Sequence, residues 1–279
     1  MIVRCWGARG SIPVSGAEFT KYGGDTTCIE IIGKDGDAII VDAGTGIRRL
    51  GNALSAEGRK TINLIFTHAH WDHLSGFPFF KPVYNESVTL NLYGCPFAQA
   101  SIKNLLSRSM SPPHFPVKLE QLKAKISYFG ACNGEFDIGS IHIVPILLSH
   151  PNQGIGYKFI EDGRSFVFLT DNELTYKHPG GLDFEQYKDF SAKADLLVHD
   201  AEYTRQEYRM TRSWGHSIFE DAVKLALDAH VKRFGMFHHN QDRTDAALDR
   251  IVDECRNIAG PKADEVECFA VGVGTEIVV

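Results

Sequence analysis

The chain has 279 residues, of which 43% are hydrophobic and 23% are charged, and its formal net charge at pH 7 is −6. This length and composition allow a sizeable buried core and exclude an intrinsically disordered chain. Because the net charge is negative, the protein as a whole does not attract phosphate polymers, and long nucleic acid is a disfavoured partner.

The six cysteines form no CxxC pair and show no regular spacing, which is typical of reduced, mostly buried thiols rather than of a disulfide framework. The first residues lack the basic start and apolar run of a secretory signal. No stretch reaches the roughly 18 apolar residues that span a bilayer. We therefore expect a cytoplasmic protein that does not enter a membrane. The cysteines are Cys5, Cys28, Cys95, Cys132, Cys255 and Cys268.

Short β-branched segments punctuated by glycine dominate the first third of the chain and predict strands. They cover residues 2–6, 26–32, 38–41 and 62–66. A helix over residues 46–56 precedes the last of them. A strand over residues 88–93 and a helix over residues 98–107 follow, and three prolines within residues 110–116 exclude regular structure there.

The strand pattern resumes in the second half and again alternates with helical segments. Strands are expected over residues 141–148, 195–199, 234–237 and 267–273, and helices over residues 217–230 and 245–258. Residues 156–160 and 165–170 flank a turn and predict a hairpin. Without a repeat, a low-complexity tract or a linker, the sequence predicts one α/β domain over residues 1–279.

A dense group of metal-ligating residues follows the strand expected at residues 62–66, namely His68, His70, Asp72 and His73. In an extended segment, His68 and His70 point to the same side because side chains alternate with a period of two. The chain turns as Asp72 and His73 enter the next helix, so these side chains can converge on a second point nearby. The sequence thus predicts two adjacent metal ions, the alternative being histidines that bind no metal. Imidazole and carboxylate ligands suit zinc, and also manganese or iron.

This HxHxDH motif resembles that of the metallo-β-lactamase superfamily, and later family motifs occur in the expected order along the chain. The resemblance implies a four-layer αββα sandwich and a hydrolase with two divalent metal ions, with zinc favoured, and no organic cofactor. In that superfamily one metal takes the first two histidines of the motif and a later histidine, which His150 matches. The other takes the aspartate and last histidine of the motif and a histidine near the C-terminus, which His238 matches, with His239 as the alternative. Asp171 matches the acidic residue that joins the two ions.

The resemblance is greatest to the tRNase Z and cyclic phosphodiesterase branch. Zinc β-lactamases carry a cysteine at the position of Asp171, so hydrolysis of β-lactams is not expected. Residues 214–217 are similar to the Gly-His-Ser/Thr segment of this branch, which implies that His216 donates a proton to the leaving oxygen while a water activated by the metals attacks phosphorus. We accordingly assign catalytic roles to Asp72, Asp171 and His216. The alternative is that His216 forms a helix N-terminus with Ser213 or Ser217.

The N-terminal segment adds a second similarity to the same branch. Residues 7–13 and 21–28 look like its glycine-rich opening, which passes near the substrate. Arg9 and Lys21 are candidates for attracting an anion there. Asp42 matches a buried aspartate of the family that supports the metal loop rather than binding metal.

The spacing between two expected ligands bears on the substrate. Enzymes that process the tRNA 3′ end carry a long arm between the third histidine and the joining aspartate. His150 and Asp171 are only 21 positions apart, filled by one expected hairpin. With the acidic net charge, this favours a small phosphodiester such as a cyclic nucleotide as the substrate. The alternatives are a tRNA 3′-processing endonuclease and a lactone or thioester hydrolase. A homodimer is compatible with the sequence.

Two further segments are candidates for the rim of the site. Residues 110–116 could form a lid in which Phe115 stacks on a base, the alternative being a segment that packs over the domain edge. Tyr176, His178 and Tyr187 are candidates for facing the cleft.

Overall fold

Two seven-stranded sheets form the centre of the computed structural model, which describes residues 1–95, 101–131, 134–260 and 266–279. The first sheet has the order β14-β1-β2-β3-β4-β5-β6, and the second has the order β13-β12-β11-β10-β9-β8-β7. The strands of the first sheet are β1 (Ile2–Gly7), β2 (Cys28–Ile32), β3 (Ala38–Val41), β4 (Thr61–Ile65), β5 (Thr89–Gly94), β6 (Lys125–Gly130) and β14 (Glu276–Val278). Those of the second are β7 (Phe136–Ile138), β8 (Ile141–Leu148), β9 (Gly154–Glu161), β10 (Arg164–Leu169), β11 (Leu196–Asp200), β12 (Arg233–Phe237) and β13 (Glu267–Ala270).

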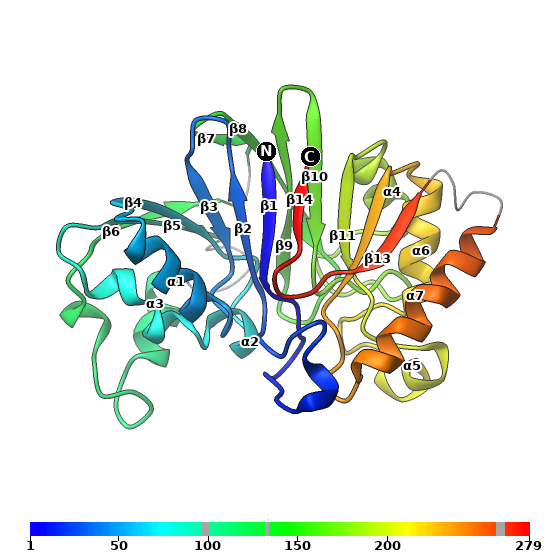
Figure 1. Cartoon of the computed structure of the whole chain (residues 1–279), viewed down its shortest axis with the longest axis horizontal. Coiled ribbons are helices and arrows are strands. Elements are labelled where there is room, and N and C mark those ends of the chain that lie inside the picture. Colours follow the sequence, from blue (N-terminus) through cyan, green and yellow to red (C-terminus); the bar gives the residue numbers. More distant parts are fainter. Residues whose placement is uncertain (96–100, 132–133, 261–265) are drawn as a thin grey trace.

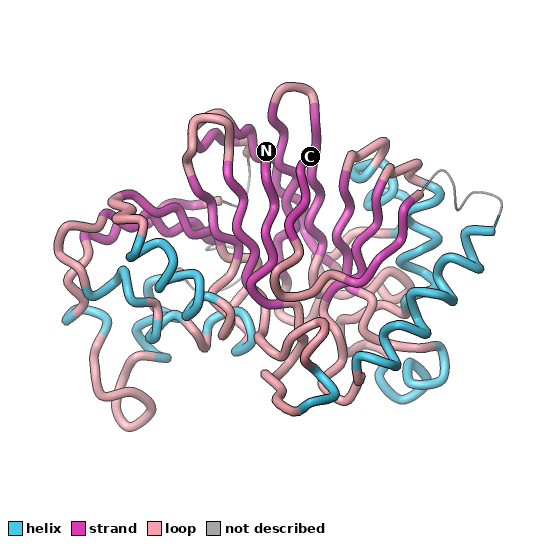
Figure 2. The backbone as a smooth tube through the Cα atoms, viewed as in Figure 1, coloured by secondary structure: helices cyan, strands magenta, loops and turns pink. Residues whose placement is uncertain are grey.

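Helices cover the outer face of each sheet, so the molecule has four layers (Figures 1 and 2). Helices α1 and α3 lie on the first sheet, and α4, α6 and α7 lie on the second. The helices are α1 (Ile47–Ala56), α2 (Trp71–Leu74), α3 (Ile102–Ser109), α4 (Phe184–Ser191), α5 (Arg205–Thr211), α6 (Phe219–Asp228) and α7 (Asp245–Ala259). The described residues also form the short 3-10 helices η1 (Ala17–Phe19), η2 (Phe77–Phe79), η3 (Lys81–Tyr84) and η4 (Leu119–Gln121).

Three apolar clusters hold these layers together. One lies between the two sheets, and one lies between each sheet and its helices. The central cluster includes the fully buried Ile31, Phe159 and Phe166. Burying both faces of a sheet requires near-continuous apolar strands, and β3 and β11 are buried at every residue. The αββα sandwich expected from the resemblance is therefore confirmed.

Each sheet changes from antiparallel to parallel pairing along its length. In the first sheet β1, β2 and β3 are antiparallel, whereas β3, β4, β5 and β6 are parallel. The second sheet repeats this with β8, β9 and β10 antiparallel and β10, β11, β12 and β13 parallel. Because parallel strands end at the same edge, the residues after β4, β10, β11 and β12 meet at one end of the sandwich.

Most predicted elements agree with the structure, and β3 and β8 have the expected bounds. The expected hairpin is formed by β9 and β10. Residues 110–116 contain neither helix nor strand, as predicted. The helix expected from residue 98 is observed from Ile102, and residues 98–100 lie outside the described part of the chain. The helix expected from residue 217 begins at Phe219, because Ile218 pairs with Tyr203 in an isolated bridge.

The expectation for the cysteines is only partly right. Cys5, Cys28, Cys255 and Cys268 are free and buried. Cys95, in contrast, takes part in a disulfide bond, so the expectation of a reduced thiol is wrong there. Spacing along the chain cannot show which thiols the fold brings together. Cys132 lies outside the described residues. Among the described helices, none has the length and apolar character to cross a membrane.

Candidate metal centre

Asp42 holds the HxHxDH loop in place. It follows β3 with a φ of 64°, in the left-handed region. One carboxylate oxygen accepts the backbone N–H of Thr67 at 2.8 Å, and the other accepts the Thr67 hydroxyl at 2.7 Å. The second oxygen also accepts Nδ1–H of His73 at 2.7 Å. This contact leaves Nε2 of His73 as its free ring nitrogen, and Asp42 occupies the supporting place that the resemblance implied.

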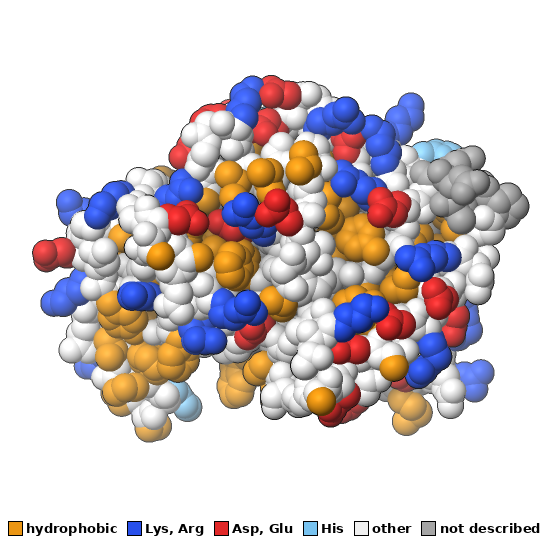
Figure 3. Space-filling model, viewed as in Figure 1, with side chains coloured by type: hydrophobic (Ala, Val, Ile, Leu, Met, Phe, Trp, Pro, Cys, Tyr) orange, Lys and Arg blue, Asp and Glu red, His pale blue; other side chains and the backbone are white. Residues whose placement is uncertain are grey.

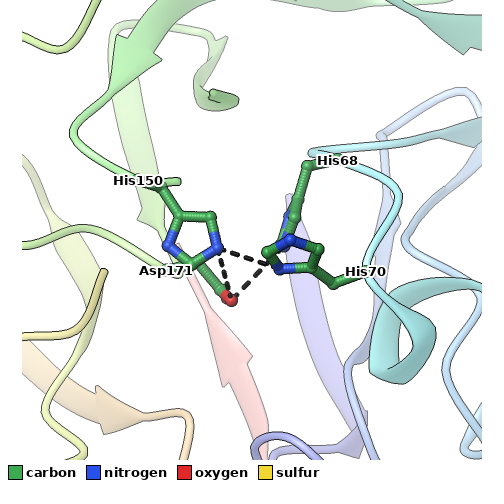
Figure 4. A group of neighbouring side chains, drawn as sticks. All are labelled: His68, His70, His150 and Asp171. Atoms are coloured by element: carbon green, nitrogen blue, oxygen red, sulfur yellow. Dashed lines mark hydrogen bonds and ion pairs between the residues drawn. The ribbon is translucent and has the colours of Figure 1, made fainter. Parts of the chain in front are cut away.

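A first group of ligand atoms comes from His68, His70, His150 and Asp171 (Figure 4). One ligand atom from each of these residues lies within 4.8 Å of the other three. Nε2 of His68 lies 3.4 Å from Oδ2 of Asp171, and Nε2 of His150 lies 3.0 Å from Nδ1 of His70. The other ring nitrogen of His150 donates to the carbonyl of Gly215 at 2.9 Å. His70 is the most exposed of the four, so the group opens on its side.

Asp72, His73, Asp171 and His238 form a second group, also within 4.8 Å. Nε2 of His73 lies 3.3 Å from Oδ2 of Asp72 and 3.2 Å from Oδ1 of Asp171. Nε2 of His238 lies 3.1 Å from Asp72 and 3.4 Å from Asp171. Asp171 thus belongs to both groups, which is the geometry required of a carboxylate shared by two cations.

The polar atoms of these groups fit divalent cations. Nε2 of His68 and Nε2 of His73 are buried and have no hydrogen-bond partner. Leaving a buried polar atom unpaired costs about 1–3 kcal/mol, so such atoms in a native structure call for a ligand. Imidazole nitrogen together with carboxylate oxygen is a donor set suited to zinc. Each group therefore offers three or four ligands to one ion.

The structure separates His238 from its neighbour His239. His238 lies among the ligand atoms, with Nδ1–H donating to Glu202 at 2.9 Å. His239 is directed away from them and donates from Nε2 to the carbonyl of Val271 at 2.7 Å. Gly10 makes room for His238, because a Cβ atom at position 10 would lie 2.3 Å from its Nδ1. Of the two histidines, the geometry makes His238 the candidate ligand.

His216 lies beside both groups and is held by two carboxylates. Its Nδ1–H donates to Oδ2 of Asp200 at 2.6 Å, and Oε2 of Glu202 lies 3.5 Å away. Its ring stacks on that of His238 at 4.4 Å and meets the ring of His150 edge-on at 5.2 Å. Burial disfavours the charged imidazolium, but Glu202 and Asp200 outweigh burial and raise the pKa of His216 to about 9. A protonated imidazole beside the ligands is suited to donate a proton.

The alternative reading of His216, as part of a helix N-terminus, does not fit the structure. Helix α6 begins after Ile218, and no side chain caps it. The backbone N–H of Ser217 donates to Asp200, and its hydroxyl donates to the carbonyl of Asn172. The segment before α6 is therefore tied to the strand ends of the second sheet rather than to the helix.

Sequence reasoning missed Asp200 and Glu202, which are both buried. Asp200 ends β11 and Glu202 follows it, so the rule that selected polar residues at strand ends applies to them too. Glu202 binds His238, and its other oxygen accepts the side-chain N–H of Asn240 at 2.9 Å. Burial opposes ionisation of Glu202, yet His216 and His238 lower the pKa of this carboxyl.

Arg9 and Lys21 do not form the anion site that the sequence suggested. Arg9 is 1% exposed, and its guanidinium donates to three backbone carbonyls, so it ties the N-terminal loop to the rest of the chain. Lys21 is exposed and pairs with Asp249 at 2.5 Å. The carbonyls bound by Arg9 belong to Gly23, Asn240 and Arg243.

The other rim candidates mostly pack inward. Phe115 is partly buried against the apolar cluster between the first sheet and its helices and meets Phe79 edge-on at 5.7 Å, which is compatible with a segment that packs over the domain edge. Tyr187 is fully buried in the core, which contradicts its expected place at the cleft. His178 is also buried and binds a neighbouring carboxylate, and Tyr176 packs edge-on against it at 4.8 Å.

Two facing sheets between helices, with a cluster of histidines and aspartates at the strand ends, define the class of metallo-β-lactamase-fold hydrolases. Consistent with this, the family model described as "Beta-lactamase superfamily domain" matches residues 37–239. The chain belongs to this superfamily and is a hydrolase related to tRNase Z.

Curated relatives and solved structures agree with this placement. Ribonuclease Z of Thermococcus kodakarensis is 25% identical over 246 residues, which cover 73% of this chain and 75% of the relative. Ribonuclease Z of Lactobacillus gasseri is 21% identical over 276 residues, covering 83% and 87%. The fold is similar to that of the metallo-β-lactamase fold protein YhfI from Bacillus subtilis, with a TM-score of 0.72, 17% identity and coverage of 99% and 98%. It is also similar to a diphosphatase of the PhnP family, with a TM-score of 0.70, 16% identity and coverage of 100% and 97%.

Proposed function

We propose that this protein is a dinuclear metal-dependent phosphodiesterase that acts on a small phosphodiester such as a cyclic nucleotide. The observation that carries the proposal is Asp171, whose carboxylate belongs to both groups of ligand atoms. His216 lies beside these groups with its Nδ1 engaged by Asp200. A pair of cation sites joined by one carboxylate, with a protonated imidazole next to them, matches the needs of phosphodiester cleavage.

The residues that would hold the two ions divide into the groups described above. His68, His70 and His150 would hold one ion, Asp72, His73 and His238 would hold the other, and Asp171 would contact both. Two divalent ions, with zinc favoured, would supply an activated water at neutral pH and neutralise charge on the phosphate. Manganese and iron are the alternatives, since the same donors accept them.

The protein's own residues supply the remaining step of the reaction. Because Nδ1–H of His216 donates to Asp200, Nε2 is the nitrogen left to transfer a proton to the departing oxygen. The contact with Asp200 fixes the orientation of the ring, as a carboxylate does for a histidine that shuttles protons. Asp72 would complete the reacting centre by holding one of the ions, and Asp171 by contacting both.

The segment between His150 and Asp171 bears on the size of the substrate. The hairpin of β9 and β10 occupies most of it and turns at residues 162–163. The stretch between His150 and Asp171 therefore has no further segment that could form an arm around a tRNA. On the face drawn in Figure 3, basic and acidic side chains are interspersed, and no continuous basic surface lies there. These features favour a small substrate over a long nucleic acid.

A tRNA 3′-processing endonuclease is the second candidate function. It is favoured by the similarity to the Ribonuclease Z sequences, which spans about three quarters or more of this chain. A lactone or thioester hydrolase is the third, because the same ligand set also polarises a carbonyl.

One experiment separates these candidates. The purified protein is analysed for bound metal and assayed against bis-p-nitrophenyl phosphate, cyclic mononucleotides, cyclic dinucleotides, unprocessed tRNA and a panel of lactones. We expect two divalent ions per chain and cleavage of one or more of the small phosphodiesters. Cleavage of tRNA alone would select the second candidate. Turnover of a lactone without phosphodiesterase activity would overturn the proposal.

A further inference from the structure

Glu173 is a buried carboxylate next to the metal centre that the chemistry above does not use. It lies two residues after Asp171 and is 1% exposed. One carboxylate oxygen accepts the Tyr208 hydroxyl at 2.5 Å and the backbone N–H of Ser213 at 2.8 Å. The other accepts the backbone N–H of Gly215 at 2.8 Å and Nε2–H of His178 at 2.8 Å. Four donors thus converge on one carboxylate.

The segment 213–215 wraps around this carboxylate as a backbone anion site does. Ser213 and Gly215 have φ angles of 71° and 99°, and such left-handed residues turn alternate N–H groups towards one point. Backbone arrangements of this kind form anion-binding concavities in proteins, and here the carboxylate of Glu173 fills the concavity. The charge of the carboxylate strengthens each of these hydrogen bonds.

The loop that Glu173 binds contacts both parts of the reacting centre. The carbonyl of Gly215 accepts Nδ1–H of His150 at 2.9 Å, which directs Nε2 of His150 towards the ligand group. The contact is tight, because a Cβ atom at position 215 would lie 2.1 Å from that nitrogen. The next residue is His216. The orientation of this loop therefore decides where a candidate ligand and the candidate proton donor lie relative to each other.

We propose that Glu173 is a positioning residue that fixes loop 213–216 and thereby sets the orientation of His150 and the place of His216. The proposal rests on the proposed function for the acid role of His216. It goes beyond that function because Glu173 touches neither the ligand atoms nor the reacting phosphate and acts only through the loop. Histidine-orienting partners of this kind contribute about 10- to 100-fold to activity or metal affinity.

The test variant is Glu173→Gln. In either orientation of the new amide, its NH₂ end faces one of two backbone N–H donors, that of Ser213 or that of Gly215. Donor then meets donor, and the loop loses at least one anchor. Glu173→Asp keeps the charge but shortens the reach by one methylene, so it provides a second variant with the same expected direction.

Glu161→Gln is the matched control. Glu161 is also a buried carboxylate, 4% exposed, and accepts the backbone N–H of Lys34 at 2.9 Å and the Ser140 hydroxyl. It lies at the far end of β9, seven residues from Gly154, which corresponds to about 23 Å along the strand. Its loss should affect general stability but not loop 213–216.

The first measurement is amide hydrogen exchange of Ser213 and Gly215, followed by NMR in the metal-loaded protein. We expect exchange at least about 10-fold faster in Glu173→Gln than in the unchanged protein, and no change in Glu161→Gln. Unchanged exchange in both Glu173 variants would overturn the proposal. This measurement needs no substrate, so it decides the role of Glu173 even if the protein cleaves no phosphodiester and the proposed function fails.

The second measurement compares two leaving groups. Nitrophenolate leaves without a proton, whereas the alkoxide released from 3′,5′-cyclic AMP requires one. In Glu173→Gln assayed at saturating metal, so that weaker binding through His150 does not limit metal content, we expect kcat for the cyclic nucleotide to fall about 10- to 100-fold with little change in KM, and kcat for bis-p-nitrophenyl phosphate to fall much less. An equal loss for both substrates, matched by Glu161→Gln, would assign Glu173 to general stability and contradict the proposal.

Discussion

The imidazole rings of His216 and His238 stack with their centroids 4.4 Å apart and their planes 16° from parallel. Each ring donates Nδ1–H to a different carboxylate, Asp200 for His216 and Glu202 for His238. The two rings differ in their surroundings. Nε2 of His238 lies 3.1 Å from Asp72 and 3.4 Å from Asp171, whereas Glu202 and Asp200 lie beside Nδ1 of His216 and raise its pKa to about 9.

Removal of the shared carboxylate should be the most damaging change. In Asp171→Ala both groups lose a ligand, so we predict less than one ion per chain and loss of hydrolysis below detection. Asp72→Ala removes a ligand from one group and should abolish hydrolysis while retaining about one ion. Elemental analysis of the purified variants measures the ions directly. Full metal content in Asp171→Ala would contradict its assignment as the shared ligand.

His216→Ala should separate proton donation from metal binding. The variant keeps every candidate ligand, so we predict two bound ions and a fall in kcat of about 10²- to 10⁴-fold for a substrate with an alkoxide leaving group. Asp200→Asn should act in the same direction but more weakly, because His216 remains while its orientation is lost. Steady-state assays at saturating substrate measure both effects. Normal turnover by His216→Ala would show that the acid role is wrong.

Gly10 should be intolerant of any side chain. A Cβ atom there would lie 2.3 Å from Nδ1 and 2.4 Å from Cε1 of His238, so Gly10→Ala must displace the ring. We predict weaker metal binding, by about 10-fold or more, measured by competition with a chelator. Gly130→Ala is the control, since a Cβ atom at that position meets nothing within 4 Å. Equal metal affinity in the two variants would mean that His238 is not held by this contact.

Much of the fold was predictable because most residues of its strands are apolar. β3 and β8 have the bounds expected from the sequence, whereas the hairpin was expected at residues 156–160 and 165–170 and is formed by Gly154–Glu161 and Arg164–Leu169. Elements that bury little gave no such pattern. β6 is exposed at five of its six residues, and α5 buries none of its residues, so neither shows a clear apolar period.

Residues of the candidate site were predictable where the HxHxDH motif or the end of an apolar strand marked them. They were not predictable where only the folded structure brings two distant residues into contact. His150 and Asp171 follow apolar runs, and the structure brings them to the motif. Asp200 stands at the end of β11 and still escaped notice, because its partner His216 lies 16 residues later. Arg9 was misjudged for the same reason: its acceptors lie more than 230 residues away in two of three cases.

Acid stability should depend on Asp195, which lies at the end of the molecule away from the metal centre. Burial disfavours its charge, but hydrogen bonds from Lys232, the backbone of Ser165 and Arg164 outweigh burial and lower the pKa of Asp195 to about 2. A carboxyl whose folded pKa lies below its unfolded value of 3.8 stabilises the fold above that value. The contribution of ionised Asp195 to the stability of the fold is lost as the pH falls from about 4 towards about 2.

We therefore predict that Asp195→Asn lowers the free energy of unfolding by about 1–2 kcal/mol at pH 7. The difference in free energy of unfolding between Asp195→Asn and the unchanged protein should shrink steadily below pH 4, because protonation of Asp195 removes the same charged hydrogen bonds that the substitution removes. Urea unfolding at pH 7, 5 and 3 measures it. Asp228→Asn is the control, since Asp228 pairs with Lys224 on an exposed helix face, where such pairs contribute about 0.3–0.5 kcal/mol. A difference for Asp195→Asn that stays constant with pH would show that the charge of this carboxylate is not what stabilises the fold.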